Sequence, residues 1–229
     1  MAAAGLLECL GRAERNKRDK RERIVRAARE LFRTKGFQAT TTTEIAELAD
    51  VGKGTLFFHA RSKQALLIMM FQEEVGRSIE RAFISVPEAP LLDQLMHVFG
   101  VMIEYNRRDL ELARIFVKEL AFVGGDRRGI DAVMADLFGR MSALIEQAQE
   151  RGEISKTANP ALLAYNLFAL YFAFLVLWLG SRAPAPDPAR PSLRQMLELH
   201  LSALPGMAAA RSIRRRKNKP PRAADGLPR

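Results

Sequence analysis

The chain has 229 residues, 48% of them hydrophobic, so it is long enough to bury a substantial core on its own. Its single cysteine, Cys9, excludes an intrachain disulfide and a cysteine-rich metal site, and it favours a reducing, cytoplasmic environment. Alanine, leucine, arginine and glutamate dominate while aromatic residues make up 7%, a composition that favours an all-α fold over a β-sandwich.

The net charge of +10 is concentrated at the two ends of the chain. Residues 1–35 carry 11 Lys and Arg against 5 Asp and Glu, and residues 207–229 carry 8 against 1. Basic ends attract polyanions, usually nucleic acid or an anionic membrane, although a merely solvated tail has the same composition. The first residues lack the long apolar run of a secretory signal, and the last lack the apolar content needed for a core. We interpret residues 1–17 as a disordered basic leader and residues 207–229 as a disordered basic tail.

A first amphipathic helix is predicted over residues 18–35. Its apolar positions recur at i, i+4, i+7 and i+8, and they are Ile24, Ala28, Leu31 and Phe32. The helix ends where Lys35 precedes Gly36, a residue able to adopt the left-handed cap conformation. Four basic residues near its start either lie along a DNA phosphate strand or form a solvated helix face; they are Arg15, Lys17, Arg18 and Lys20.

Two short helices follow, joined by a tight turn. Thr41 and Glu44 match the S/T-x-x-E capping box that satisfies the free amide groups at a helix start. The apolar pattern breaks at residues 50–52, where Gly52 relieves the turn, and a third helical segment covers residues 53–59. This arrangement is typical of a helix-turn-helix, whose second helix enters the DNA major groove while the first braces on the backbone. An ordinary helical corner has the same pattern, so both interpretations stay open at this point.

Six further helices account for most of the remaining chain. Ser62 is positioned to cap a long helix that runs towards Arg81. The other five are predicted over residues 91–105, 109–122, 126–151, 160–179 and 192–204. Glycines and the proline-rich segment 183–191 separate them.

Three stretches resemble the TetR family of transcriptional regulators in order, spacing and length. Residues 24–37 (IVRAARELFRTKGF) resemble the family's first helix, residues 40–57 (TTTTEIAELADVGKGTLF) its second and third, and residues 62–66 (SKQAL) the start of its fourth. The resemblance implies a three-helix DNA-binding domain over residues 18–66. A long helix would join it to a helical ligand-binding and dimerisation domain over residues 67–206.

The resemblance also implies roles for the residues of the helix-turn-helix. Thr41 and Thr43, at a helix start, would hold a phosphate with hydroxyl and amide donors. Lys53 and Thr55 would contact base edges, Lys53 on guanine acceptors and Thr55 through its methyl group on thymine. Gly54 would let the backbone approach the DNA closely.

Four more positions complete this expected interface. His59 and Lys63 are placed for phosphate contacts. Phe57 stands where the family usually has a tyrosine that reaches a phosphate, so an apolar contact to sugar or thymine methyl is expected instead. Ala60 replaces a usual phenylalanine and thins the packing below the recognition helix.

The segment 162–180 carries no charged residue and is almost long enough to cross a bilayer. One interpretation is a membrane-associated helical protein anchored by this segment. The resemblance implies instead a helix that dimerises the protein, because a helix that is apolar all round is expected where a four-helix bundle forms between subunits. Residues 160–180 and 192–204 would then form the homodimer interface, and no membrane would be involved.

A pocket for a small lipophilic or aromatic effector is expected among the middle helices, where methionine and aromatic residues are plentiful. Its candidate residues are Met70, Phe99, Met102, Tyr105, Phe116, Met134, Phe138 and Asn166, the last as a hydrogen-bonding group. The same residues at helical spacing also suit an ordinary packed core. In that alternative, the protein is a constitutive DNA-binding protein without an effector.

No pattern in the sequence predicts catalysis. It has no phosphate-binding loop, no nucleophile elbow and no His, Asp or Glu cluster with metal-ligand spacing, and His97 and His200 are isolated. We therefore expect no enzyme, cofactor or metal. The predicted function is that of a homodimeric regulator, acting as a repressor, that binds a palindromic DNA operator and is released by its effector.

Overall fold

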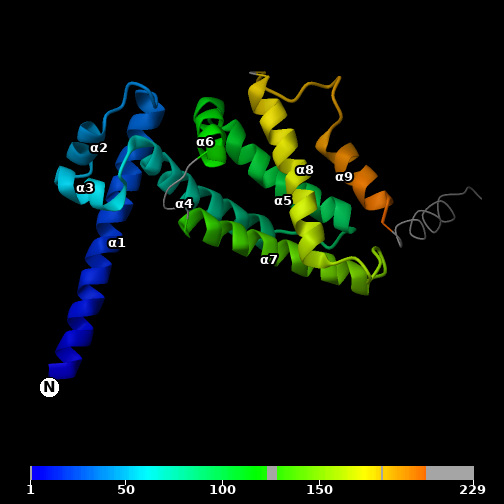
Figure 1. Cartoon of the computed structure of the whole chain (residues 1–229), viewed down its shortest axis with the longest axis horizontal. Helices are drawn as coiled ribbons and strands as arrows, with labels where there is room; N and C mark the ends of the chain where they lie inside the picture. Colours follow the sequence, from blue (N-terminus) through cyan, green and yellow to red (C-terminus); the bar gives the residue numbers. More distant parts are fainter. Residues whose placement is uncertain (1, 123–127, 182, 205–229) are drawn as a thin grey trace, which may run out of the picture.

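The computed structural model of the chain describes residues 2–122, 128–181 and 183–204, and this part is helical (Figure 1). The helices are α1 (Ala2–Thr34), α2 (Thr42–Leu48), α3 (Lys53–His59), α4 (Lys63–Ile84), α5 (Leu91–Arg107), α6 (Leu110–Phe122), α7 (Arg128–Glu150), α8 (Pro160–Gly180) and α9 (Leu193–Ser202). No strand occurs among the described residues, and the all-α prediction is confirmed. The predicted tail, residues 207–229, lies outside the described residues.

The structure corrects the prediction of a disordered leader, because α1 begins at Ala2 rather than near residue 18. Residues 2–17 contain no proline and consist mainly of good helix formers. Gly5 and Gly11 each cost about 1 kcal/mol relative to alanine, which weakens a helix without ending it. The apolar periodicity marks only where α1 packs, so its N-terminal half projects from the rest of the protein with residues 12–20 exposed (Figure 1).

Helices α1, α2 and α3 form a small unit around a common core. Ile24, Ala28 and Phe32 of α1 are buried together with Ile45 of α2 and Leu56 of α3. Gly36 adopts φ +84° at the end of α1, as the sequence predicts for a helix cap.

The turn between α2 and α3 differs from the prediction in its mechanism. Asp50, not Gly52, takes the left-handed conformation, with φ 49°, while Gly52 has φ −64° and caps α3. Aspartate tolerates this region better than most residues. The side chain of Arg23 on α1 forms an exposed ion pair with Asp50, with Nη1 3.1 Å from Oδ2.

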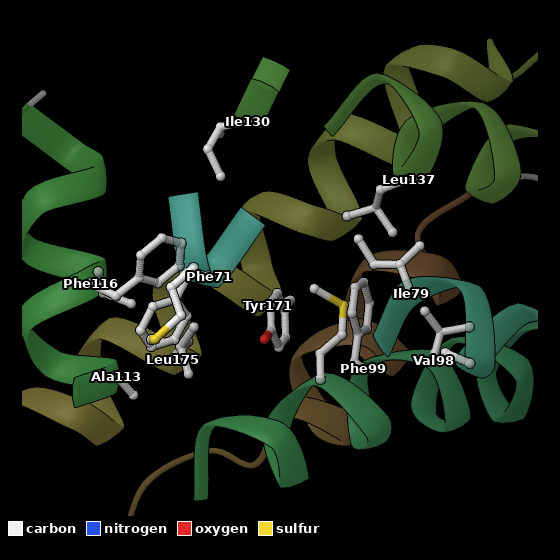
Figure 2. Packing of buried hydrophobic residues seen from close by; sticks show 14 of the residues in the cluster. Phe71, Ile79, Val98, Phe99, Ala113, Phe116, Ile130, Leu137, Tyr171 and Leu175 are labelled. Atoms are coloured by element: carbon white, nitrogen blue, oxygen red, sulfur yellow. The ribbon is translucent and has the colours of Figure 1, made fainter. Parts of the chain in front are cut away.

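Helix α4 joins this unit to the remaining helices, since it packs against α1 and also against α5, α6 and α7. Figure 2 shows the core beyond it, where aromatic rings from different helices stack. The ring centroids of Phe71 on α4 and Phe116 on α6 are 4.1 Å apart, and those of Phe99 on α5 and Tyr171 on α8 are 4.7 Å apart. The first pair joins α4 to α6, and the second joins α5 to α8.

Helix α8 has two apolar faces, and the structure buries only one of them. Leu163, Leu167, Tyr171 and Leu175 point into the core, and α7 and α9 pack beside the helix. The opposite face exposes large apolar side chains, namely Leu162, Tyr165, Val176 and Leu177. By length and composition alone this helix qualifies as a membrane span, and 39% of its most apolar window is buried within the chain.

Candidate DNA interface and effector cavity

Helix α3 presents an exposed surface because Leu56 is its buried anchor. Lys53, Gly54 and Phe57 are exposed, and Thr55 is half-buried beside them. Phe58 is the most exposed aromatic side chain of α3, at 73%, and the sequence reasoning missed it. Its position was predictable, since residue 58 lies one helical turn beyond Gly54 on the face opposite Leu56.

Gly54 has no role in internal packing. A Cβ built at this position meets no heavy atom within 4 Å, and its backbone is helical. The missing side chain therefore matters only to a partner that approaches from outside.

The start of α2 is organised around Glu44. The carboxylate accepts hydrogen bonds from the Thr41 backbone N–H at 2.8 Å and the Thr41 hydroxyl at 2.9 Å, and the Glu44 N–H donates to Thr41 Oγ1 at 3.2 Å. The capping box is thus confirmed, and both donors expected to hold a phosphate at Thr41 already bind a carboxylate. Thr43, half-buried in the first turn of α2, remains the threonine without such a constraint.

The pKa of Glu44 is lowered to about 2. The largest cause is the hydrogen bond from the Lys35 ammonium, followed by the backbone and side-chain hydrogen bonds from Thr41. Lys35 belongs to the turn after α1, so this carboxylate ties α2 to the end of α1.

Lys63 is held near the loop between α1 and α2. Its Nζ donates to the Gln38 carbonyl at 3.0 Å and lies 4.6 Å from the centre of the Phe37 ring. The charge thus stays next to the helix-turn-helix, held by partners within the protein.

His59, at the end of α3, faces the basic surface of α1. Burial lowers its pKa most, and the positive charges of Arg21, Lys17 and Lys20 lower it further. An open cavity of about 450 Å³ lies between these elements, lined by Gly11, Glu14, Arg15, Lys17, Arg18, Arg21 and His59. The structure thus brings the basic residues of α1 and the end of the recognition helix together.

The eight residues predicted to line an effector pocket do not surround one cavity. Met70, Phe99, Met102 and Phe116 are buried in the packed core, and the space beside Met70 and Tyr105 is about 10 Å³. Tyr105 donates its hydroxyl to Glu74.

The other three predicted pocket residues lie nearer the surface. Met134 and Phe138 are half-buried on α7, where Phe138 stacks on Tyr165 of α8 at 3.8 Å. Asn166 is exposed, because it lies on the face of α8 opposite the buried Leu167 and Tyr171. Its amide group therefore lies outside the packed core of the described residues.

An apolar cavity of about 540 Å³ lies elsewhere, between α5, α8, α9 and the segment 186–191. Its apolar wall consists of Met96, Ile103, Phe174, Leu177, Trp178, Leu193 and Met196. The Trp178 indole N–H is buried and has no acceptor among the described residues. Sequence reasoning missed this cavity; the available signal was the proline-rich segment between α8 and α9, which contributes Pro186, Pro188 and Pro191 to its wall.

Comparisons with known proteins agree with this geometry. The family described as bacterial regulatory proteins, tetR family, matches residues 24–70, which include α2, α3 and the start of α4. The chain is 25% identical over 186 residues to the HTH-type transcriptional regulator YhgD of Bacillus subtilis, which covers 80% of this chain and 95% of that protein.

Two further proteins are similar over most of this chain. The A-factor receptor protein of Streptomyces griseus is 30% identical over 186 residues, or 81% of this chain and 62% of that protein. The crystal structure of FadR from Thermus thermophilus, a TetR family repressor in complex with lauroyl-CoA, is 27% identical. It matches with a TM-score of 0.59 over 90% of this chain and 100% of that one.

These comparisons support a TetR family transcriptional regulator.

Residues 24–70 match the family's DNA-binding segment, and the proteins to which the chain is similar are named as transcriptional regulators. In the part of the chain that the structure describes, no group of three His, Cys, Asp or Glu side chains is arranged to hold a metal ion.

The depressed pKa of Glu44 makes a prediction about acid stability. A carboxylate whose pKa is lower in the folded state stabilises the fold above its ordinary pKa of 4.5, and this contribution is lost as the pH falls towards 2. Glu44→Gln is therefore expected to lower the urea midpoint at neutral pH, with the difference from wild type shrinking below pH 4.5. Glu47→Gln, an exposed change on the same helix, is the control. Parallel pH curves for wild type and Glu44→Gln would contradict the assignment.

Proposed function

We propose that this TetR family regulator is a cytoplasmic homodimeric repressor that binds a palindromic operator and is released by a lipophilic effector. The observation that carries the proposal is α4, which packs on the helix-turn-helix unit through α1 and on the C-terminal helices through α5, α6 and α7. A change among the C-terminal helices therefore has a continuous helix through which to move α3.

The operator would be read by α3. In a two-fold dimer, two recognition helices enter successive major grooves about 34–36 Å apart. Lys53 and Thr55 supply the base contacts, Gly54 permits close approach of the backbone, and Phe57 supplies an apolar contact. Thr43, His59 and Lys63 supply phosphate contacts around them, and Thr41 joins them only by giving up Glu44.

The substitution Gly54→Ala tests the role of α3 in DNA binding separately from its role in folding. Alanine favours the helix by about 1 kcal/mol and meets nothing inside the protein, so stability is expected to hold or rise. Operator affinity is expected to fall because the methyl group blocks the backbone approach. The affinity is measured by fluorescence anisotropy with the DNA upstream of the protein's own gene. A scrambled duplex serves for comparison, and both duplexes are titrated at two salt concentrations.

Matched lysine variants control the same titration. Lys53→Ala is expected to cost about 1–3 kcal/mol of sequence-specific binding, whereas Lys156→Ala, an exposed change far along the chain, leaves it unchanged. Equal and strongly salt-dependent binding to both duplexes would mean that the basic ends alone bind DNA, which would refute sequence-specific reading by α3 at this site.

The second copy of the chain would cover the exposed face of α8. Leu162 is 63% exposed and Leu177 is 53% exposed on this face, and Leu199 of α9 is 73% exposed. Exposed apolar residues on two helices that pack against each other suit a four-helix bundle across a two-fold axis.

Leu162→Glu is expected to convert the dimer to a monomer of 25.6 kDa, because it places a charge in the apolar interface. Light scattering after size exclusion measures the mass. Leu48→Glu, an equally apolar exposed position on α2, is expected to leave the dimer intact. A monomeric wild type would refute the dimer, and recovery only in detergent would favour the membrane-associated alternative.

The effector would bind in the 540 Å³ cavity, which lies within the size range of small-molecule sites. An acyl chain suits its apolar wall. The similar FadR of Thermus thermophilus binds lauroyl-CoA, which supports this class of ligand. Because α8 lines the cavity and also exposes the proposed dimer face, filling the cavity would shift the population towards a dimer with wrongly spaced recognition helices.

Lauroyl-CoA is expected to lower the anisotropy of the wild-type operator complex in a saturable way. Met96→Trp fills the cavity and is expected to raise the required concentration about tenfold, a cost of about 1.4 kcal/mol. Met134→Trp, on α7 outside the cavity, is the control. It also tests whether the effector binds instead among the pocket residues that the sequence predicted. Operator binding that no acyl-CoA reverses would favour the constitutive alternative.

A further inference from the structure

A second cavity, of about 450 Å³, lies where α1, α4 and the end of α5 meet, away from the apolar cavity. Five arginines and two glutamates line it together with Tyr105, giving a net formal charge of +3. The arginines come from three separate parts of the chain: Arg29 and Arg33 from α1, Arg77 and Arg81 from α4, and Arg108 from the residue after α5. Figure 1 shows α4 crossing α1 at this junction.

Glu74 neutralises part of the positive charge of this cavity. It is 11% exposed, pairs with Arg29 and accepts a hydrogen bond from the Tyr105 hydroxyl. Burial raises the pKa of Tyr105, as does the hydrogen bond to Glu74, so the hydroxyl stays protonated and donates. The Glu74 carboxylate thus joins α1, α4 and α5, and most of its capacity to accept hydrogen bonds is already used.

The remaining guanidinium groups lack a carboxylate at hydrogen-bond distance. Arg33 Nη2 is 3.7 Å from Glu74 Oε2, beyond the usual hydrogen-bond range of about 2.7–3.2 Å. Arg81 Nη2 donates only to the neutral Ser78 hydroxyl, at 3.1 Å. Arg77 and Arg108 have no ion pair within 4.0 Å among the described residues.

Planar guanidinium groups that converge without anions of their own suit phosphate oxygens, which they bind through paired hydrogen bonds. We propose that this cavity binds a small ligand bearing two or more phosphate groups, held by Arg33, Arg77 and Arg108. More than one phosphate is expected because the three arginines come from three elements around a space of 450 Å³. Such a ligand would bridge the DNA-binding unit to the C-terminal helices at a point separate from the acyl effector.

Glu80 is the residue that opposes the ligand. It lines the same cavity on α4 and repels an anion, and no salt bridge within the described residues neutralises it. Removing its charge should therefore strengthen binding, a result that a merely structural role would not produce.

Isothermal titration of the full-length protein with inorganic pyrophosphate tests the proposal. Saturable binding is expected, with Arg77→Gln and Arg108→Gln each weakening it about tenfold and Glu80→Gln strengthening it. Arg107→Gln is the matched control, because Arg107 pairs with Glu104 outside the cavity. Thermal melts of each variant verify that it is folded.

The source of the phosphates is distinguished by parallel titrations with ADP and inorganic phosphate. Equal affinity for ADP and pyrophosphate identifies a site for the phosphates alone, and tighter ADP binding identifies a nucleotide; either supports the proposal. Absence of saturable binding by every polyphosphate overturns it. So does an equal loss in Arg107→Gln and Arg77→Gln, or weaker binding by Glu80→Gln.

Discussion

The arrangement of the whole protein depends on the continuous burial of α4. Leu66, Leu67 and Met70 are buried near its start, and Ile79 and Ala82 are buried near its end. Helix α4 packs both against α1 and against the C-terminal helices α5, α6 and α7. A helix buried in this way behaves as a rigid element, since packed cores repack between discrete arrangements rather than deform smoothly.

The second constraint is the double use of α8. One face completes the core through Tyr171 and Leu175, and the adjoining surface exposes Val176 and Leu177. Leu177 also lines the apolar cavity. The proposed effector site and the proposed subunit interface therefore share side chains, which gives the ligand a direct route to the geometry of the dimer without a long chain of intermediate contacts.

Local features of the fold could be predicted from the sequence because they depend on neighbours a few residues apart. The capping box of Thr41 and Glu44 and the left-handed Gly36 are both present. The prediction for the turn failed at Asp50, because aspartate tolerates the left-handed region and pairs there with Arg23, a residue distant in sequence. The extension of α1 to Ala2 was missed because its first turns have helix propensity without amphipathic periodicity.

The candidate sites divide in the same way. The exposure of Lys53 and Gly54 follows from the period of one short helix, so it could be predicted from the sequence alone. Composition indicated correctly that Phe99 and Phe116 are buried. It could not indicate that their rings stack instead of lining a space, because a cavity is what remains after helices far apart in sequence have packed. The grouping of Arg33 with Arg77 and Arg108 was hidden for the same reason.

The projecting half of α1 also affects how the protein meets a polyanion. A disordered basic arm loses conformational entropy when it settles on DNA, at about 1–2 kcal/mol for each backbone residue that becomes fixed. Residues 12–20 are already helical and exposed, with their charges at fixed spacing. Contact along this helix therefore requires little ordering of the backbone, and most of the electrostatic attraction is retained as affinity. A polyanion that met this helix would encounter a preformed basic surface, and its binding would weaken steeply as salt rises.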